Sequence, residues 1–277
     1  MLVPALIGVI ALELIPAALT LGLAFTEYDA LHPPVWVGLR NFAQLLADPN
    51  FGLALRNTAW FLACCVPLRL LIGLGSALLL SRETPAHGLL RAASLAPTLM
   101  PEAAYAVAWL WLVNPVYGPL NQLLTALGLP VSGWLADPAH AARVFVVMAL
   151  FQAGESFLIT LAALRSVPLA VREAAQLDGA GSIARLRWVT LPIVLPWLGV
   201  AALRDSVLLL FYTLAPTRLM SGGAPDYSTL FLPLYTFQQS VDFLRLGYGA
   251  AATLLLWLLA LLPFGISVAW LRRNPYA

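Results

Sequence analysis

The chain has 277 residues, of which 61% are hydrophobic and 10% are charged, with a formal net charge of +2. Soluble domains carry about 25% charged residues, so this composition excludes an ordinary soluble domain and indicates an integral membrane protein. The small net charge gives no sign of a nucleic-acid partner. The two cysteines, Cys64 and Cys65, are adjacent inside an apolar run and indicate nothing about the redox compartment.

Six apolar runs are long enough to cross a bilayer as helices, which takes about 20 mostly apolar residues. The first run is longer than a typical signal-peptide core and has no basic flank, so we expect a retained spanning helix. The predicted fold class is an all-α membrane protein with six transmembrane helices. In chain order the six runs cover residues 2–25, 58–80, 92–114, 143–165, 191–215 and 249–271.

The arginines between the runs predict the orientation of the chain. One set of connections, which is short overall, carries Arg82, Arg91, Arg165, Arg172, Arg185, Arg187, Arg272 and Arg273. The longer connections on the other side carry only Arg40, Arg56, Arg143, Arg218 and Arg245. Because basic residues concentrate in short cytoplasmic loops, we expect both termini in the cytoplasm. Residues 36–56 and 119–130 have helical spacing of apolar positions, which predicts interfacial helices on the opposite face.

The connection between the fourth and fifth runs has the most distinctive pattern. Pro168 ends the preceding helix, because proline lacks an N–H and restrains the residue before it. A short helix is expected over 169–176, and a second one is expected to start with Ser182 as its N-cap. We therefore expect two short helices at an angle, outside the membrane and open to a soluble partner. The motif between and around them reads Glu173-Ala174-Ala175, Asp178-Gly179-Ala180 and Val189-Thr190-Leu191-Pro192.

This motif resembles the EAA loop of bacterial ABC importer permeases, with Val189 where isoleucine is usual. The likeness covers nearly the whole chain and is greatest for the carbohydrate type, similar to the permeases for maltose and glycerol-3-phosphate. It implies the type I ABC importer permease fold. The division it implies is a first transmembrane helix and outer amphipathic segment over 1–56, an ABC type-1 transmembrane core over 57–271 and a cytoplasmic tail over 272–277. Further segments that carry the likeness are 37–42, 109–111, 117–121, 161–168 and 221–229, where Ala224 interrupts the usual Gly-Gly-Pro.

The resemblance also implies an assembly in the bacterial inner membrane, in contact with its lipid. The partners are a second, homologous permease subunit that completes a heterodimer, two cytoplasmic ATP-binding subunits and an extracytoplasmic solute-binding protein. ATP hydrolysis is expected on the partners, because a chain without lysine has no Gly-x-x-x-x-Gly-Lys phosphate loop. We expect no cofactor and no metal on this chain. The expected ATPase-docking residues are Glu173, Ala174, Ala175, Asp178, Gly179 and Ala180.

Ionisable residues lie near the centres of five of the six runs. Each costs about 2.5–3.5 kcal/mol at mid-bilayer, so their common depth predicts a polar cavity for a polar solute. Pairing within the core also explains any single one of them. Neighbouring residues on a helix point about 100° apart, so we expect Arg204 and Asp205 to face different neighbours. We also expect Arg204 to pair and Glu155 to contact solute. These central residues are Glu13, Arg69, Glu102, Glu155, Arg204 and Asp205.

The candidate solute pathway consists of Glu155, Asp205, Arg204, Glu102 and Trp109. The Trp109 ring has two interpretations, a stacking surface for a sugar and an anchor at the membrane interface. Among the central residues, four carboxylates against two arginines favour a neutral or amine-bearing solute over an anion.

The expected function is to move a sugar, a sugar-like polyol or a glycerophosphodiester across the inner membrane by alternating access, driven by ATP. Two alternatives stay open. A proton-coupled secondary transporter would use Glu155 or Asp205 as a proton site, and a membrane enzyme would use the same carboxylates as acid and base. The loop at Glu173 argues against the first, because a proton-coupled carrier needs no ATPase dock.

Overall fold

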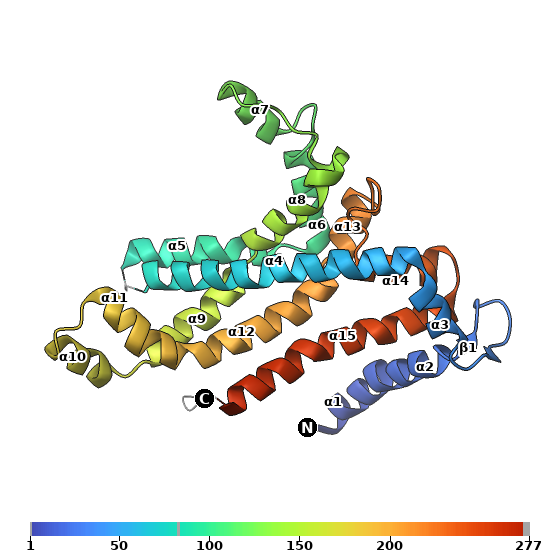
Figure 1. The fold of residues 1–277 in the computed structure, drawn as a ribbon, viewed down its shortest axis with the longest axis horizontal. Helices are drawn as coiled ribbons and strands as arrows, with labels where there is room; N and C mark the ends of the chain where they lie inside the picture. The colour runs from blue at the N-terminus through green and yellow to red at the C-terminus, as the bar shows by residue number, and fades with distance from the viewer. Residues whose placement is uncertain (1, 82–83, 274–277) are drawn as a thin grey trace.

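Long helices dominate the structure, a computed structural model that describes residues 2–81 and 84–273. Four of them lie side by side in Figure 1: α4 (Pro49–Leu79), α9 (Gly154–Ser166), α12 (Leu191–Tyr212) and α15 (Leu246–Arg273). Helix α12 contacts the other three and therefore forms the centre of the bundle. Arg82 and the tail residues 274–277 lie outside the described residues.

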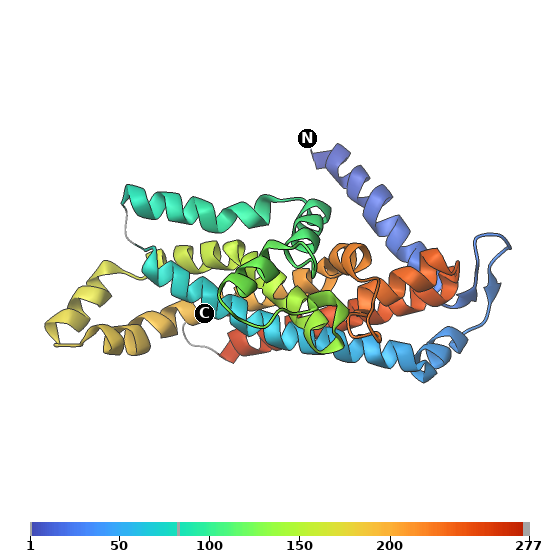
Figure 2. The ribbon, with the colours of Figure 1, turned by 90° about the horizontal axis from the view of Figure 1, so that it is seen from above.

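The N-terminal helix stands apart from this bundle. It consists of α1 (Leu2–Val9), a π-helical turn (Ile10–Leu14) and α2 (Ile15–Leu23). None of the residues in its most apolar window is buried inside the chain, and Figure 2 shows it projecting away from the other helices. Its end packs on α15 and leads into the two-stranded antiparallel hairpin of β1 (Thr26–Glu27) and β2 (Val35–Trp36).

The predicted third span over 92–114 is wrong as a single helix. The structure has α5 (Pro85–Leu95), a 3-10 turn (Ala96–Leu99) and α6 (Glu102–Leu112). Pro97 and Pro101 lie at this break, and neither offers an N–H to continue an α-helix. Thr98 and Glu102, beside this break, line a cavity within the molecule.

The predicted fourth span also bends. Helix α8 (Pro138–Phe151) meets α9 at an angle of 42°. A Cβ on Gly154, the first residue of α9, would lie 2.7 Å from the carbonyl oxygen of Ser94. The absence of a side chain there lets the bend approach the backbone of α5 closely.

The fifth predicted span continues far beyond its expected bounds. Helix α11 (Ser182–Arg185), a π-helical turn (Leu186–Thr190), α12 and α13 (Leu214–Met220) follow one another as a helical stretch of 39 residues. Before it lies α10 (Leu169–Leu177), so the two short helices expected around Gly179 are present. The N-cap of α11 is Gly181, and Ser182 is its first helical residue, so the N-cap prediction is wrong by one position.

Short elements connect the long helices. They are α3 (Arg40–Ala47), α7 (Pro119–Ala126), a 3-10 turn (Trp134–Ala136), α14 (Leu232–Phe237) and a π-helical turn (Gln238–Asp242). Helices α3 and α14 lie toward the end of the molecule opposite α10, and α7 projects from the side of the bundle (Figure 1). The amphipathic helix expected over 36–56 is only partly correct, because residues 49–56 belong to α4. Asp48 separates the two helices, and its side chain caps α4 by accepting a hydrogen bond from the N–H of Asn50 at 2.8 Å.

Four helices among the described residues are long and apolar enough to cross a membrane, and the bent α8–α9 pair makes a fifth candidate. The broken α5–α6 segment is not among them. The predicted boundary after residue 56 falls inside α4, so no break in the backbone marks it.

The contact between α4 and α9 depends on Gly73. A Cβ at this position would lie 3.0 Å from the carbonyl carbon of Ser156 and 3.1 Å from the amide nitrogen of Phe157. Both atoms belong to the backbone of α9 and have little freedom to move. We predict that Gly73→Leu separates the two helices and destabilises the fold by about 1–3 kcal/mol, measured as a lower thermal unfolding temperature in detergent.

The matched control is Gly75→Leu on the same helix, where nothing lies within 4 Å of the added Cβ. This variant should unfold close to the wild-type temperature. Equal unfolding temperatures for the two variants would contradict the packing argument.

Candidate functional site

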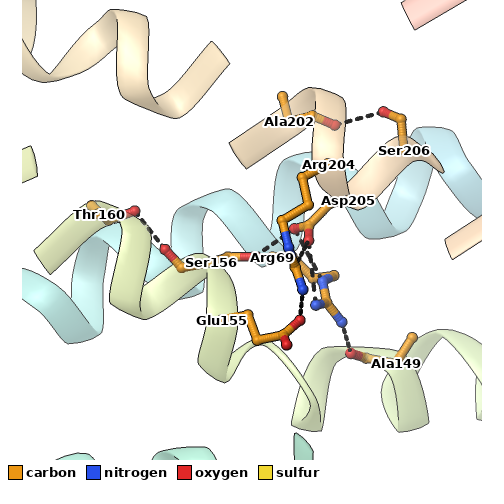
Figure 3. Close-up of polar contacts among 9 residues, drawn as sticks. All are labelled: Arg69, Ala149, Glu155, Ser156, Thr160, Ala202, Arg204, Asp205 and Ser206. Atoms are coloured by element: carbon orange, nitrogen blue, oxygen red, sulfur yellow. Dashed lines mark hydrogen bonds and ion pairs between the residues drawn. The ribbon is translucent and has the colours of Figure 1, made fainter. Parts of the chain in front are cut away.

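A buried ion pair joins the helices at the centre of the bundle. Arg69 on α4 donates from Nε to Asp205 Oδ2 at 3.1 Å and from Nη2 to Asp205 Oδ1 at 3.4 Å. The two side chains are 7% and 1% exposed. Ser156 Oγ on α9 donates to the same carboxylate at 2.6 Å, and Arg69 Nη1 donates to the carbonyl of Ala149 on α8 at 2.7 Å (Figure 3). Three helices, α4, α9 and α12, therefore meet at the Asp205 carboxylate, and Arg69 links α8 to the same cluster.

A second ion pair lies beside the first and is partly exposed. Arg204 on α12 pairs with Glu155 on α9, and their side chains are 27% and 47% exposed. Arg204 Nη1 also lies 3.3 Å from Asp205 Oδ1. As expected, Arg204 and Asp205 face different neighbours, Glu155 and Arg69, but the long arginine side chain also folds back to the carboxylate of Asp205 (Figure 3).

A cavity of about 170 Å³ opens beside these pairs. It brings together Glu102 at the start of α6 and Glu155 at the start of α9, two of the residues predicted for the solute pathway. The buried hydroxyl of Tyr212 forms no hydrogen bond within the described chain. The lining residues are Arg69, Thr98, Met100, Glu102, Gln152, Glu155, Leu208, Leu209 and Tyr212.

The charges around this cavity do not cancel. Arg69 balances Asp205, and Arg204 balances Glu155. Glu102 is exposed, and no ion pair engages it within residues 2–81 and 84–273. The cluster therefore carries one excess negative charge beside a small polar cavity.

Two residues singled out in the sequence, the pathway candidate Trp109 and the central residue Glu13, lie elsewhere. Trp109 is 8% exposed and packs edge-on against Tyr105 and Phe151, with ring centroids 6.1 and 5.5 Å away. Its ring is used in helix packing and does not line the cavity. Glu13 is exposed on the N-terminal helix that stands apart from the bundle.

Sequence reasoning missed several polar residues of the site. Ser156 supplies the shortest hydrogen bond to Asp205, while Gln152 and Tyr212 line the cavity. Glu155 and Ser156 follow Gln152 by three and four residues, about one helical turn, and these polar residues in an apolar run were the available signal. Thr98 reaches the cavity only because the helix breaks after Leu95, which the apolar run concealed.

The loop with the Glu-Ala-Ala motif lies at one end of the molecule, far from the hairpin of β1 and β2 (Figure 1). Gly179 ends α10 with φ of +77°, a left-handed conformation that favours glycine. The other predicted docking residues lie on α10 or in the turn that follows it. Glu173, Ala174, Asp178 and Gly179 are exposed, and Ala175 and Ala180 are half-buried.

Large apolar side chains are also exposed on this loop. Leu177 is 89% exposed, Ile183 81% and Trp188 71%. Leu177 precedes the helical stretch 182–220, whereas Ile183 and Trp188 lie at its beginning, and exposed apolar side chains at this end of the molecule favour a partner that covers them. No group of three potential metal ligands occurs in the described part of the chain.

The burial of the first ion pair generates a prediction. Removing the carboxylate in Asp205→Ala leaves the Arg69 guanidinium buried without a counter-charge, at a cost of about 3–5 kcal/mol. We expect a large loss of monodisperse protein, measured by fluorescence-detected size-exclusion chromatography. Glu155→Gln is the comparison and should lose less protein, because its partner Arg204 is partly exposed and keeps its contact with Asp205. A normal yield of Asp205→Ala would contradict the structural role of the pair.

The chain was compared with protein-family models and with known proteins. No family model matches it. The chain is 30% identical over 280 residues to the probable ABC transporter permease protein YesP of Bacillus subtilis, covering 97% of this chain and 89% of that protein. It is 30% identical over 278 residues to the sulfoquinovosyl glycerol transport system permease protein SmoG of Agrobacterium fabrum, covering 95% and 90% of the two chains. It is 31% identical over 229 residues to the trehalose/maltose transport system permease protein MalF of Thermococcus litoralis, covering 82% and 76%.

A solved structure shows the same fold. The crystal structure of a bacterial alginate ABC transporter, in complex with an alginate pentasaccharide-bound periplasmic protein, contains a chain that matches with a TM-score of 0.81. The sequence identity is 20%, and the match covers 96% of this chain and 91% of that chain. The relatives are permease subunits, which transport and are not enzymes. The exposed loop and the polar centre of the apolar bundle are consistent with such a subunit. The chain belongs to the ABC transporter permease family.

Proposed function

We propose that this chain is one of two permease subunits of an ATP-driven importer for a neutral sugar or polyol. The observation that carries the proposal is one helical stretch that connects the exposed loop to the polar cavity. Residues 182–220 begin in the loop and carry both Arg204 and Asp205. Ser182 and Asp205 are 23 residues apart, which is about 35 Å at 1.5 Å per residue.

This stretch offers a route for coupling. A displacement of α10 and α11 by a soluble ATPase would move α12, and with it the partly exposed Arg204–Glu155 pair beside the cavity. The more deeply buried Arg69–Asp205 pair would hold α4, α8, α9 and α12 together during the movement. The π-helical turn Leu186–Thr190 lies between the loop and α12, and such turns are common at functional sites.

The cavity and the relatives together support the proposed solute class. Sugar hydroxyls need both donors and acceptors, and the cavity provides the Gln152 amide, the Tyr212 hydroxyl and carboxylates. The excess charge at Glu102 favours a neutral solute over an anionic one, which sets the proposed solute apart from an anionic glycerophosphodiester. Relatives described as permeases for trehalose/maltose and for starch degradation products support the carbohydrate class.

The proposed assembly contains a second permease subunit, two cytoplasmic ATP-binding subunits and an extracytoplasmic binding protein, within the inner-membrane lipid. The exposed loop with Glu173, Ala174, Ala175, Asp178, Gly179 and Ala180 would dock on an ATPase. The apolar residues exposed on the same loop support such a contact. Transport would follow alternating access, with the cavity open to one side at a time.

We propose six crossings, with both termini in the cytoplasm. The four long helices and the bent α8–α9 pair provide five of them, and the broken α5–α6 segment would be the sixth. The distribution of arginine supports this orientation, because the connections beside the Glu173 loop have the higher density of basic residues. The core over 57–271 and the tail over 272–277 are kept as proposed divisions.

The loop geometry generates a test of docking. Proline at position 179 cannot adopt φ of +77° and also removes the Gly179 N–H that donates to the carbonyl of Gln176 at 3.0 Å. We predict that Gly179→Pro abolishes the stimulation of ATP hydrolysis by loaded binding protein in the reconstituted transporter, while the permease still assembles.

Gly181→Pro is the matched control. Gly181 has φ of −64°, which the proline ring already favours, so stimulation should remain close to that of the wild type. A charge reversal, Glu173→Lys, should uncouple as Gly179→Pro does. Wild-type stimulation in Gly179→Pro and Glu173→Lys would remove the support for docking through this loop.

The proposed orientation generates a labelling prediction. After Cys64→Ala and Cys65→Ala, a cysteine at the exposed Ser182 should react with a membrane-impermeant thiol reagent only from the cytoplasmic side. A cysteine at Leu127, which is 64% exposed beyond α7, should react only from the opposite side. Reaction of both positions from one side would contradict the proposed topology.

A further inference from the structure

A second polar cavity, of about 440 Å³, lies between α4, the first turns of α8 and the loop at 226–228. We call it the outer cavity, because it lies toward the end of α4 that is remote from the Glu173 loop (Figure 1). It shares no residue with the 170 Å³ cavity beside the two ion pairs. Its lining residues are Leu53, Arg56, Asn57, Trp60, Pro138, Ala139, Ala142, Arg143, Asp226, Tyr227 and Ser228.

Two arginines from different helices line this cavity and outnumber its one carboxylate. Arg56 on α4 and Arg143 on α8 are exposed, and neither forms an ion pair in the part of the chain that the structure describes. The lining contains one carboxylate, Asp226, so the two guanidinium groups leave an excess positive charge. Asp137 is not among the lining residues but lies near enough to Arg143 to offset part of its charge, while its carboxylate also accepts the N–H of Ala139 at 2.9 Å and contacts His140.

The wall of the outer cavity is fixed by hydrogen bonds. Asn57 Nδ2 donates to the carbonyl oxygens of Tyr227 and Leu230 at 2.9 and 3.1 Å, which ties the loop to α4. The next residue, Thr58, accepts the N–H of Leu232 at 2.8 Å. The loop at 226–228 is therefore held against α4, and the cavity that it lines with Arg56 and Arg143 has a fixed wall.

The position of the outer cavity along α4 indicates which layer of the membrane surrounds it. Arg56 lies 13 residues before Arg69 on α4, which is about 20 Å along the helix, and Trp60 lies about 14 Å from the same point. If the central charges mark the middle of the bilayer, Trp60 reaches the edge of a hydrocarbon core about 30 Å thick. Arg56 then lies in the headgroup layer, which ends about 20–22 Å from the middle. Any tilt of α4 moves both residues closer to the hydrocarbon.

This combination matches the chemistry of a lipid headgroup. Paired guanidinium groups bind phosphate oxygens with strong, charge-assisted hydrogen bonds. Trp60 is 41% exposed and lies one helical turn from Arg56, at the level where tryptophan anchors proteins in membranes. A soluble protein would have to enter the headgroup layer to reach the same position. We propose that the outer cavity binds the phosphate of an anionic phospholipid in the leaflet opposite the Glu173 loop.

The test measures lipid retention and does not depend on transport. The transporter, assembled with its own partner subunits, is delipidated in detergent and titrated with phosphatidylglycerol or phosphatidylcholine, with bound lipid counted by native mass spectrometry. Basic side chains near a membrane contribute enough attraction for a preference of about thirtyfold from two arginines. We expect the wild type to prefer phosphatidylglycerol by about this factor and Arg56→Gln/Arg143→Gln to lose most of the preference.

The matched control is Arg40→Gln/Arg218→Gln. It removes the same charge at sites outside the outer cavity, where the two arginines are already paired with Glu27 and Asp242. This control should keep the preference. If the glutamine pair assembles poorly, Arg56→Lys/Arg143→Lys keeps both charges and should retain most of the lipid selectivity.

Three results would overturn the proposal. The first is equal retention of phosphatidylglycerol by the wild type and Arg56→Gln/Arg143→Gln, and the second is an equal loss in the control pair. The third is displacement of the lipid by inorganic phosphate in molar excess, which would assign the site to a free anion.

The first result has a specific meaning when a second measurement accompanies it. If lipid retention is unchanged in Arg56→Gln/Arg143→Gln but the stimulation of ATP hydrolysis by binding protein is lost, the surface contacts a soluble protein instead.

Discussion

The buried contact between Arg69 and Asp205 is the constraint on which the rest of the bundle depends. Two charges at 7% and 1% exposure are costly to remove from water, and the cost is offset only when their hydrogen bonds are satisfied. Here Ser156 and the Ala149 carbonyl provide the remaining partners. Because these partners come from four helices, the pair admits few relative positions of α4, α8, α9 and α12. Apolar packing alone specifies position less strictly, since neighbouring lipid is as apolar as the helices.

The second ion pair has a different character because it is open to the cavity. Arg204 and Glu155 are partly exposed, so water or a solute can replace part of their interaction at a smaller cost. The centre of the molecule thus combines one pair that fixes the helices with one that can change partners. Both include residues of α12, the helix that continues from the exposed loop. This arrangement connects the exposed loop, the proposed ATPase dock, with the cavity proposed for the solute.

The sequence predicted the membrane class, most of the long helices, the two short helices around Gly179 and the family, because these depend on local composition and spacing. It did not predict the break between α5 and α6, since the apolar run continues through Pro97 and Pro101. It identified the charged residues at the centre but not their partners. Whether Arg204 reaches Asp205 depends on a side-chain conformation set by Glu155 on another helix, and a linear pattern does not contain that information. The burial of Trp109 was equally unpredictable from the sequence, because its contact with Phe151 depends on how α6 packs on α8.

The central claim, ATP-driven import through this permease, is tested most directly by uptake into proteoliposomes that contain the complete assembly. The labelled solute is the one that co-purifies with the cognate binding protein. The account predicts accumulation that requires both binding protein and ATP on the side of the ATPases, with no need for a proton gradient. Accumulation driven by a proton gradient without ATP, or uptake by the permease chains alone, would contradict it.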